Sequence, residues 1–251
     1  DGKSFIKGYG TAGTTAHATT PDAATIFQIG SVSKLFTASL LQVLCDEGVV
    51  SMDATLDELI GRSMPLSPAA RQVTLKQLVT HTSGFPSVPK SLGVQATSKA
   101  GDDDLMLDPY SHLGPQFVFD YLATTEDKKA AGRFEYSNFG MGLLAHVLEI
   151  VTGNDYESLV KEKVLAPLGM RETAITLTPE LQRHLAQGHT PKGAPTRMWS
   201  FAALAGAGGF SSSAQDMLRF IQAHVEKDGP ASERFQKMRK PQFGGNTGIG
   251  W

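Results

Sequence analysis

The sequence contains a single cysteine, Cys45, so no disulfide can form within the chain. It also lacks an excess of basic charge, because 23 Lys and Arg residues stand against 25 Asp and Glu and the formal net charge is −2. This balance argues against a nucleic-acid partner. No apolar run is long enough to span a bilayer, and none of the 7 histidines forms a metal-ligand pair at helical spacing. We therefore expect neither a transmembrane segment nor a metal.

Two nucleotide-binding fingerprints are present only in part. Residues 8–13 fit Gly-x-Gly-x-x-Gly, but a polar loop follows where a dinucleotide-binding helix should begin. Residues 2–4 resemble the end of a phosphate-binding loop without its upstream glycine. No Gly-x-Ser-x-Gly elbow exists, which argues against the α/β-hydrolase fold. We expect no cofactor.

The composition that is present is that of a globular protein, with 41% hydrophobic and 19% charged residues over 251 positions. A chain of this length can bury a sizeable core, as one domain or as two closely packed ones. It opens at Asp1 without a signal peptide, as expected of a mature or trimmed product.

Apolar periodicity predicts a mostly helical centre, with strand-like sequence towards both ends. We expect a short strand at residues 4–9 and a flexible stretch of small residues at 205–209. Residues 84–115 are expected to form a long loop, which in a compact domain is usually functional or mobile. The expected helices span residues 31–47, 53–60, 74–81 and 139–151, a segment from Asp155 to about 166–169, and a segment from Ser213 to about 226.

The pattern Ser-x-x-Lys begins at four serines: Ser4, Ser31, Ser87 and Ser158. In a strand at residues 4–9 the two side chains would point to opposite faces. Prolines flank Ser87 and prevent a regular helix, whereas Ser158 lies on an amphipathic helix among acidic residues, which indicates a solvated face. Only Ser31 stands where an apolar stretch turns through a glycine into the start of a helix.

The position of Ser31 suits a nucleophile. Unpaired backbone N–H groups and the positive end of the helix dipole favour a developing oxyanion at a helix N-terminus. Lys34 follows one turn later on the same face, so its amine can reach the Ser31 hydroxyl. Burial would lower the pKa of Lys34 from roughly 10.4 towards neutrality, and the neutral amine could then accept the hydroxyl proton. The alternative is a serine helix cap beside an exposed lysine.

Tyr136-Ser137-Asn138 is the second cluster with chemical potential. A phenol near a lysine can serve as general base or acid. The Asn138 carboxamide can accept a hydrogen bond from Lys34 and donate one to a substrate carbonyl. A buried tyrosine followed by an asparagine in a turn is the structural alternative.

Together these motifs resemble those of class C β-lactamases and their penicillin-binding relatives. Residues 27–34 (Phe-Gln-Ile-Gly-Ser-Val-Ser-Lys) are similar to the first motif of that group, and Tyr136-Ser137-Asn138 is similar to the second. Supporting stretches at residues 75–84, 167–170 and 207–212 follow in the same order. The resemblance implies an α+β fold of the β-lactamase/transpeptidase type, with an antiparallel sheet built from both chain ends and a mostly helical domain.

By this resemblance Ser31 is the acylated residue, Lys34 is its activating partner, and Tyr136 handles the protons of Ser31 and of the leaving group. Asn138 would hold the substrate amide, and the Ser31 backbone N–H would be one oxyanion donor. The resemblance also implies a small-molecule or peptide substrate and export to the periplasm or the exterior.

The third motif of the family, a cation followed by Thr or Ser and then Gly, has no clear match near the C-terminus. Lys227-Asp228-Gly229 ends a helix, and Asn246-Thr247-Gly248 lacks the cation. We therefore expect one catalytic unit trimmed at both ends, with an incomplete sheet. Its sheet side would comprise residues 1–30 and about 205–251, and its helical side residues from about 31 to 204.

Three functions fit these observations. The favoured one is a serine hydrolase that acts on β-lactam, D-amino-acid peptide or ester substrates through an acyl-enzyme. The others are a penicillin-binding or scaffold protein with little turnover, and a carboxylesterase in which Asn138 is incidental. Asn138 favours amide substrates, since an ester hydrolase has less need of an amide clamp.

Overall fold

The computed structural model describes residues 4–13, 19–89, 108, 110–111, 113–126, 129–190, 192–226, 231–242 and 248–250. Within these ranges the α-helices are α1 Ser33–Asp46, α2 Leu56–Ile60, α3 Pro68–Arg71, α4 Leu75–Val79, α5 Pro115–Thr124, α6 Asn138–Thr152, α7 Tyr156–Val160, α8 Pro179–Arg183, α9 Ala205–Gly208, α10 Ala214–Val225 and α11 Ser232–Arg239. The strands are β1 Ile26–Gln28, β2 Gly188–His189, β3 Pro195–Thr196 and β4 Ser211–Ser213. Short turns of 3-10 helix lie at Gly30–Val32, Ala166–Leu168 and Ala202–Leu204, and a π-helical turn lies at Lys161–Leu165.

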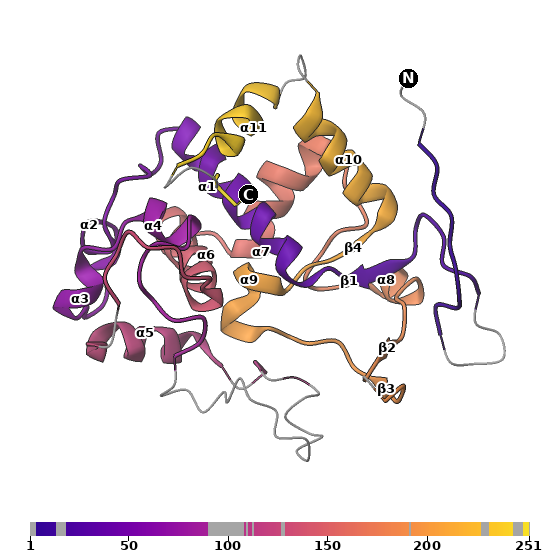
Figure 1. Ribbon diagram of the computed structural model, residues 1–251, viewed down its shortest axis with the longest axis horizontal. Helices are drawn as coiled ribbons and strands as arrows, with labels where there is room; N and C mark the ends of the chain where they lie inside the picture. Colours follow the sequence, from indigo (N-terminus) through magenta and orange to yellow (C-terminus); the bar gives the residue numbers. More distant parts are fainter. Residues whose placement is uncertain are drawn as a thin grey trace.

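Helix α1 forms the centre of the molecule (Figure 1). It is buried on nearly all sides, with α6, α7, α9 and α11 packed around it. Its buried residues are mostly apolar, and buried polar ones such as Lys34 and Thr37 have hydrogen-bond partners. The Phe36 ring lies edge-on to Phe210 at 5.2 Å and to Phe220 at 5.0 Å, which joins α1 to the segment around β4 and to α10.

Side-chain caps fix where several helices begin. The Asp155 carboxylate accepts the Ser158 N–H at 2.9 Å, and Ser213 Oγ accepts the Asp216 N–H at 3.1 Å. Thr55 and Thr74 each close a capping box at the start of α2 and α4. The expected helix starts at Asp155 and Ser213 are therefore confirmed, and the other expected starts agree with the structure to within a few residues.

An early and a late segment of the chain, just before α1 and just before α10, meet in an antiparallel pair of strands. Strand β1 pairs with β4 so that Ile26 lies opposite Ser213 and Gln28 lies opposite Ser211. A second pair, β2 with β3, is separate from it. A small antiparallel sheet from both chain ends beside a mostly helical remainder is the α+β arrangement that the sequence predicts (Figure 1).

The expected strand at residues 4–9 is wrong, since these residues form neither strand nor helix. Backbone pairing in this part of the chain begins only at Ala12, which donates to the Thr19 carbonyl and accepts from the Gln187 N–H. A strand is stable only when a neighbour satisfies its N–H and C=O groups. No described segment provides that neighbour alongside residues 4–9.

The small residues at 205–209 also differ from expectation. They form helix α9 and lie against α6 and α1, with Gly206, Ala207 and Gly208 buried. A side chain on Gly206 would come within 2.7 Å of Ala145 Cβ and of the Met141 carbonyl oxygen. The small residues therefore serve close packing between helices rather than flexibility.

Gly142 on α6 tests this close packing. A Cβ at Gly142 would lie 2.9 Å from the Leu204 backbone and 3.0 Å from the Ala203 carbonyl oxygen. Gly142→Ala gains about 1 kcal/mol in helix propensity, but overpacking typically costs about 1–3 kcal/mol. We expect a lower free energy of unfolding in urea titration. A higher unfolding midpoint with an unchanged slope would contradict close packing at this contact.

Candidate active site

Ser31 lies in the 3-10 turn that joins β1 to α1. Gly30 precedes it with a φ of 51°, in the left-handed region that favours glycine. The Ser31 side chain is exposed, and two groups donate to its hydroxyl oxygen. Lys34 Nζ lies 3.0 Å from Ser31 Oγ, and the Tyr136 hydroxyl lies 2.7 Å from it. The structure thus brings together three residues that the sequence singles out.

Lys34 reaches Ser31 from one turn further along α1. Its side chain is only 5% exposed, and Nζ also donates to the Ala207 carbonyl at 2.6 Å. Burial lowers the pKa of Lys34 to about 7. A large fraction of this amine is therefore neutral near pH 7 and has a lone pair that can accept a proton. The alternative of an exposed lysine is wrong.

Helix α9 supplies the acceptors that hold the start of α1. The Thr37 hydroxyl donates to the Gly206 carbonyl at 2.7 Å, beside the Lys34 bond to Ala207. The Phe210 N–H donates to Ser33 Oγ at 3.1 Å. The carbonyls at the C-terminal end of a helix lack partners within that helix. Here the Thr37 and Lys34 side chains of α1 donate to the carbonyls of Gly206 and Ala207.

Tyr136 approaches Ser31 from the segment that precedes α6. Its ring lies under the Lys34 amine, with Nζ 4.7 Å from the ring centroid. Tyr136 is 41% exposed, whereas Lys34 next to it is buried. The hydroxyl that bonds Ser31 is therefore accessible to a molecule bound from solvent.

Asn138 is the first residue of α6 and is half-buried. Its carboxamide interacts with the Tyr110 phenol. The hydrogen bonds of Lys34 go to Ser31 and Ala207, so the expected Lys34–Asn138 bond is not formed in this structure.

Sequence reasoning missed the aromatic cluster of Tyr110, Trp199 and Phe201. The Tyr110 ring stacks on Phe201 at 5.1 Å and meets Trp199 edge-on at 5.9 Å. Burial and the neighbouring Tyr136 phenol raise the pKa of Tyr110, and its interaction with Asn138 opposes them. The cluster therefore lies next to the predicted site residues. It comes from two segments without regular secondary structure, so no periodicity marks it.

The other Ser-x-x-Lys patterns have different surroundings. Ser158 is exposed, and Lys161 forms an ion pair with Glu157 at 2.7 Å, as a solvated face predicts. Ser4 lies outside any helix, and Lys90 of the Ser87 pattern lies outside the described residues. Neither Lys227-Asp228-Gly229 nor Asn246-Thr247 lies within the described residues.

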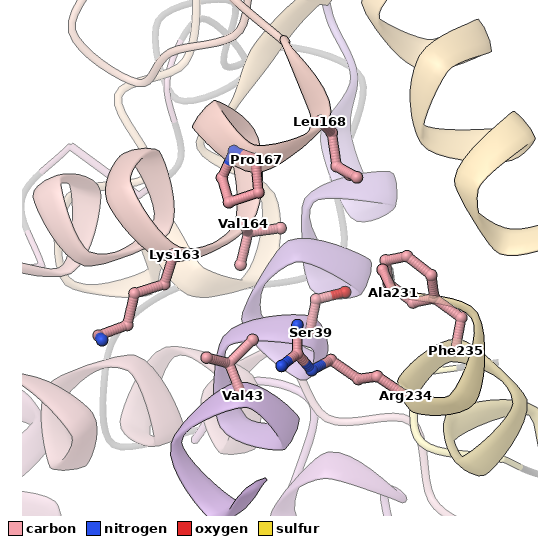
Figure 2. Close-up of a pocket in the computed structure, with 9 residues that line it drawn as sticks. All are labelled: Ser39, Val43, Lys163, Val164, Pro167, Leu168, Ala231, Arg234 and Phe235. Carbon is pink, nitrogen blue, oxygen red and sulfur yellow. The ribbon is translucent and has the colours of Figure 1, made fainter. Parts of the chain in front are cut away.

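A pocket elsewhere on the molecule is lined by residues of α1 and α11, together with residues 163–164 and 167–168 (Figure 2). Arg234 on its rim is paired with Asp46 at 2.9 Å. None of the predicted site residues lines this pocket.

In the part of the chain that the structure describes, no three His, Cys, Asp or Glu side chains gather to hold a metal, and no helix is long and apolar enough to cross a membrane.

The Beta-lactamase family profile matches residues 1–251. The chain belongs to the Beta-lactamase family. It is 30% identical over 211 residues to the D-alanyl-D-alanine-carboxypeptidase/endopeptidase AmpH of Escherichia coli K12, covering 83% of this chain and 51% of that protein. It is 27% identical to a beta-lactamase of Pseudomonas fluorescens, covering 90% of this chain and 60% of that protein. The chain thus spans about half the length of the curated relatives it matches.

Solved structures confirm the expected β-lactamase/transpeptidase fold. The octameric penicillin-binding protein homologue of Pyrococcus abyssi superposes with a TM-score of 0.78 at 28% identity, over 98% of this chain and 57% of that one. A class C beta lactamase superposes with a TM-score of 0.77 over 95% of this chain and 61% of that one, at 23% identity.

The buried amine predicts how the reactivity of Ser31 depends on pH. Neutral Lys34 can accept the Ser31 proton and the ammonium cannot, so labelling of Ser31 by a fluorophosphonate should accelerate as the pH rises through about 7. The rate is measured by intact mass between pH 5.5 and 8.5. Lys34→Arg, which stays charged, should label slowly throughout. A wild-type rate that does not change over this range would contradict the proton-accepting role.

Proposed function

We propose that this protein is a serine hydrolase that forms an acyl-enzyme on Ser31. The observation that carries the proposal is the position of one exposed hydroxyl, with Lys34 Nζ at 3.0 Å and the Tyr136 hydroxyl at 2.7 Å. A nucleophile next to a base of near-neutral pKa is the arrangement that acyl transfer requires. Membership of the Beta-lactamase family supports the same reaction class.

In the proposed acylation, Ser31 Oγ attacks the substrate carbonyl carbon while its proton passes to the Lys34–Tyr136 pair. The carbonyl π electrons move to oxygen and form a tetrahedral intermediate. When that intermediate collapses, the bond to the leaving group breaks and Tyr136 returns a proton to the departing nitrogen or oxygen. The exposed Tyr136 phenol is hydrogen-bonded to Ser31 and lies close to Lys34, so it can take part both in removing the Ser31 proton and in protonating the leaving group.

In the proposed deacylation, water adds to the acyl carbon and gives its proton to the same pair. The pair returns that proton to Ser31 Oγ as the Ser31–acyl bond breaks and the acid product leaves. Glu135 is adjacent in sequence to Tyr136, but its carboxylate is paired with Lys129 at 2.7 Å. Tyr136 is therefore the group that we propose to prepare the water.

For the substrate we propose a β-lactam or D-amino-acid peptide, with esters as further substrates. The Asn138 carboxamide can both accept a hydrogen bond from an amide group and donate one to it, and the relative from Escherichia coli is named a D-alanyl-D-alanine carboxypeptidase/endopeptidase. Tyr110 and Trp199 of the aromatic cluster are half-buried, and we propose that their rings contact the substrate side chain. Such substrates are consistent with an exported protein.

A second candidate is a penicillin-binding protein with little turnover. A penicillin-binding protein homologue is among the similar solved structures, and both functions share acylation. They differ in how fast the acyl group leaves. Release of product from a penicillin or p-nitrophenyl ester adduct, followed by mass over time, distinguishes the hydrolase from the binding protein.

Labelling tests the choice of nucleophile. A fluorophosphonate or penicillin should add once to the chain, and the adduct should map to the peptide containing Ser31. Ser31→Ala should abolish it. Ser158→Ala is the matched control, because Ser158 begins the same pattern on an exposed helix face and should leave labelling unchanged. An adduct on another serine would remove Ser31 from the mechanism.

A second substitution tests Tyr136. Tyr136→Phe should slow fluorophosphonate labelling of Ser31 by roughly a hundredfold, as expected for the loss of a general acid–base group. Tyr9→Phe is the control, because Tyr9 is also exposed and also carries a lysine amine over its ring, that of Lys7 at 5.1 Å. Equal rates for Tyr136→Phe and wild type would exclude proton transfer by Tyr136.

A further inference from the structure

We propose that His81 is a positioning residue that holds the Tyr136 phenol on Ser31. This inference rests on the proposed function. His81 follows α4 and is largely buried, with 9% of its surface exposed. Its proposed role is exerted through Tyr136.

The backbone of His81 is in an uncommon conformation. Its φ is 58°, in the left-handed region that most non-glycine residues avoid and that histidine enters more often than most. Such conformations persist when surrounding contacts determine them, and they are concentrated at functional sites. The contacts of His81 therefore identify what the conformation serves.

Three contacts of His81 surround Tyr136. The His81 carbonyl accepts the N–H of Glu135, the residue before the tyrosine, at 2.7 Å. Its ring Nδ1 accepts the N–H of Ser137, the residue after the tyrosine, at 3.1 Å. The imidazole lies against the Tyr136 ring, with centroids 4.7 Å apart and planes inclined by 36°. One residue thus fixes the backbone on both sides of the phenol and one face of its ring.

The charge state of His81 agrees with this geometry. Nδ1 can accept the Ser137 N–H only when it carries no proton, so the ring proton lies on Nε2. Burial and the nearby Lys34 charge lower the pKa of His81 to about 4. The imidazole is therefore neutral and can accept this bond at any pH near neutrality.

A histidine that only fills the core would affect labelling through folding, whereas a positioning residue affects it through Tyr136. The two roles separate in a double-mutant cycle. His81→Asn keeps a side-chain acceptor and tolerates the left-handed backbone but removes the ring. His81→Phe keeps an aromatic ring and removes the acceptor.

Each variant is made in the wild-type chain and in Tyr136→Phe, and the rate of fluorophosphonate labelling of Ser31 is measured at pH 7.5. We expect His81→Asn and His81→Phe to slow labelling at least tenfold in the wild-type background and less than twofold in Tyr136→Phe. His224→Asn is the matched control. His224 is also buried, its pKa is also lowered to about 4, and its ring stacks on Phe235 at 3.6 Å, but it lies on α10. It should leave labelling unchanged.

Equal fold-losses in both backgrounds would overturn the proposal. So would failure of both His81 variants to fold, by thermal unfolding, while His224→Asn folds, since the role would then be structural. If wild-type Ser31 is never labelled, the proposed function fails and the inference fails with it. If Ser31 is labelled and the cycle is additive, only the role of His81 is lost.

Discussion

Burial of one amine underlies the arrangement around Ser31. Lys34 lies on the central helix, and its Nζ is held between the Ser31 hydroxyl and the Ala207 carbonyl. A buried ammonium is costly, and the protein resolves this by lowering the pKa to about 7 rather than by supplying a carboxylate partner. A carboxylate would have kept the amine charged and unable to accept a proton. A neutral acceptor, the backbone carbonyl of α9, orients the amine without fixing its charge.

The same constraint explains the helices around α1. For a carbonyl of α9 to meet Lys34, α9 has to approach both α1 and α6 closely, and only small residues allow that approach. The aromatic side chains Phe36, Phe210 and Phe220 fill the adjacent space on the other side. The core side chains are thus small near the Lys34 amine and bulky further from it.

What the sequence predicts well is local. Ser31 lies in the helical turn that leads into α1, three positions before Lys34, so helical spacing alone places the two side chains together. The caps at Asp155 and Ser213 are likewise set by residues three positions apart. Tyr136 is 105 positions from Ser31, and only the family resemblance joined the two.

What the sequence missed depends on contacts between distant segments. Residues 4–9 could form a strand only if another segment paired with them, and the sequence does not show that none does. The close packing of α9 depends on α6 lying beside it, which the sequence of α9 alone does not show. Ala207 acts through its backbone carbonyl, so its side chain carries no signal. His81 lies in a stretch that supports the resemblance, but its conformation and its contacts with residues 135–137 exist only in the folded chain.

The missing side chain of Gly208 has a consequence for how this site could be reshaped. A Cβ at Gly208 would lie 2.3 Å from Phe201 Cε1, so the Phe201 ring occupies the space that a residue at 208 would need. The space beside residue 208 is thus filled by the side chain of residue 201, the Phe201 ring of the aromatic cluster. A bulky residue at 208 therefore requires a small one at 201. Such a paired exchange would move apolar side-chain volume from residue 201 onto α9, the helix whose Ala207 carbonyl binds Lys34.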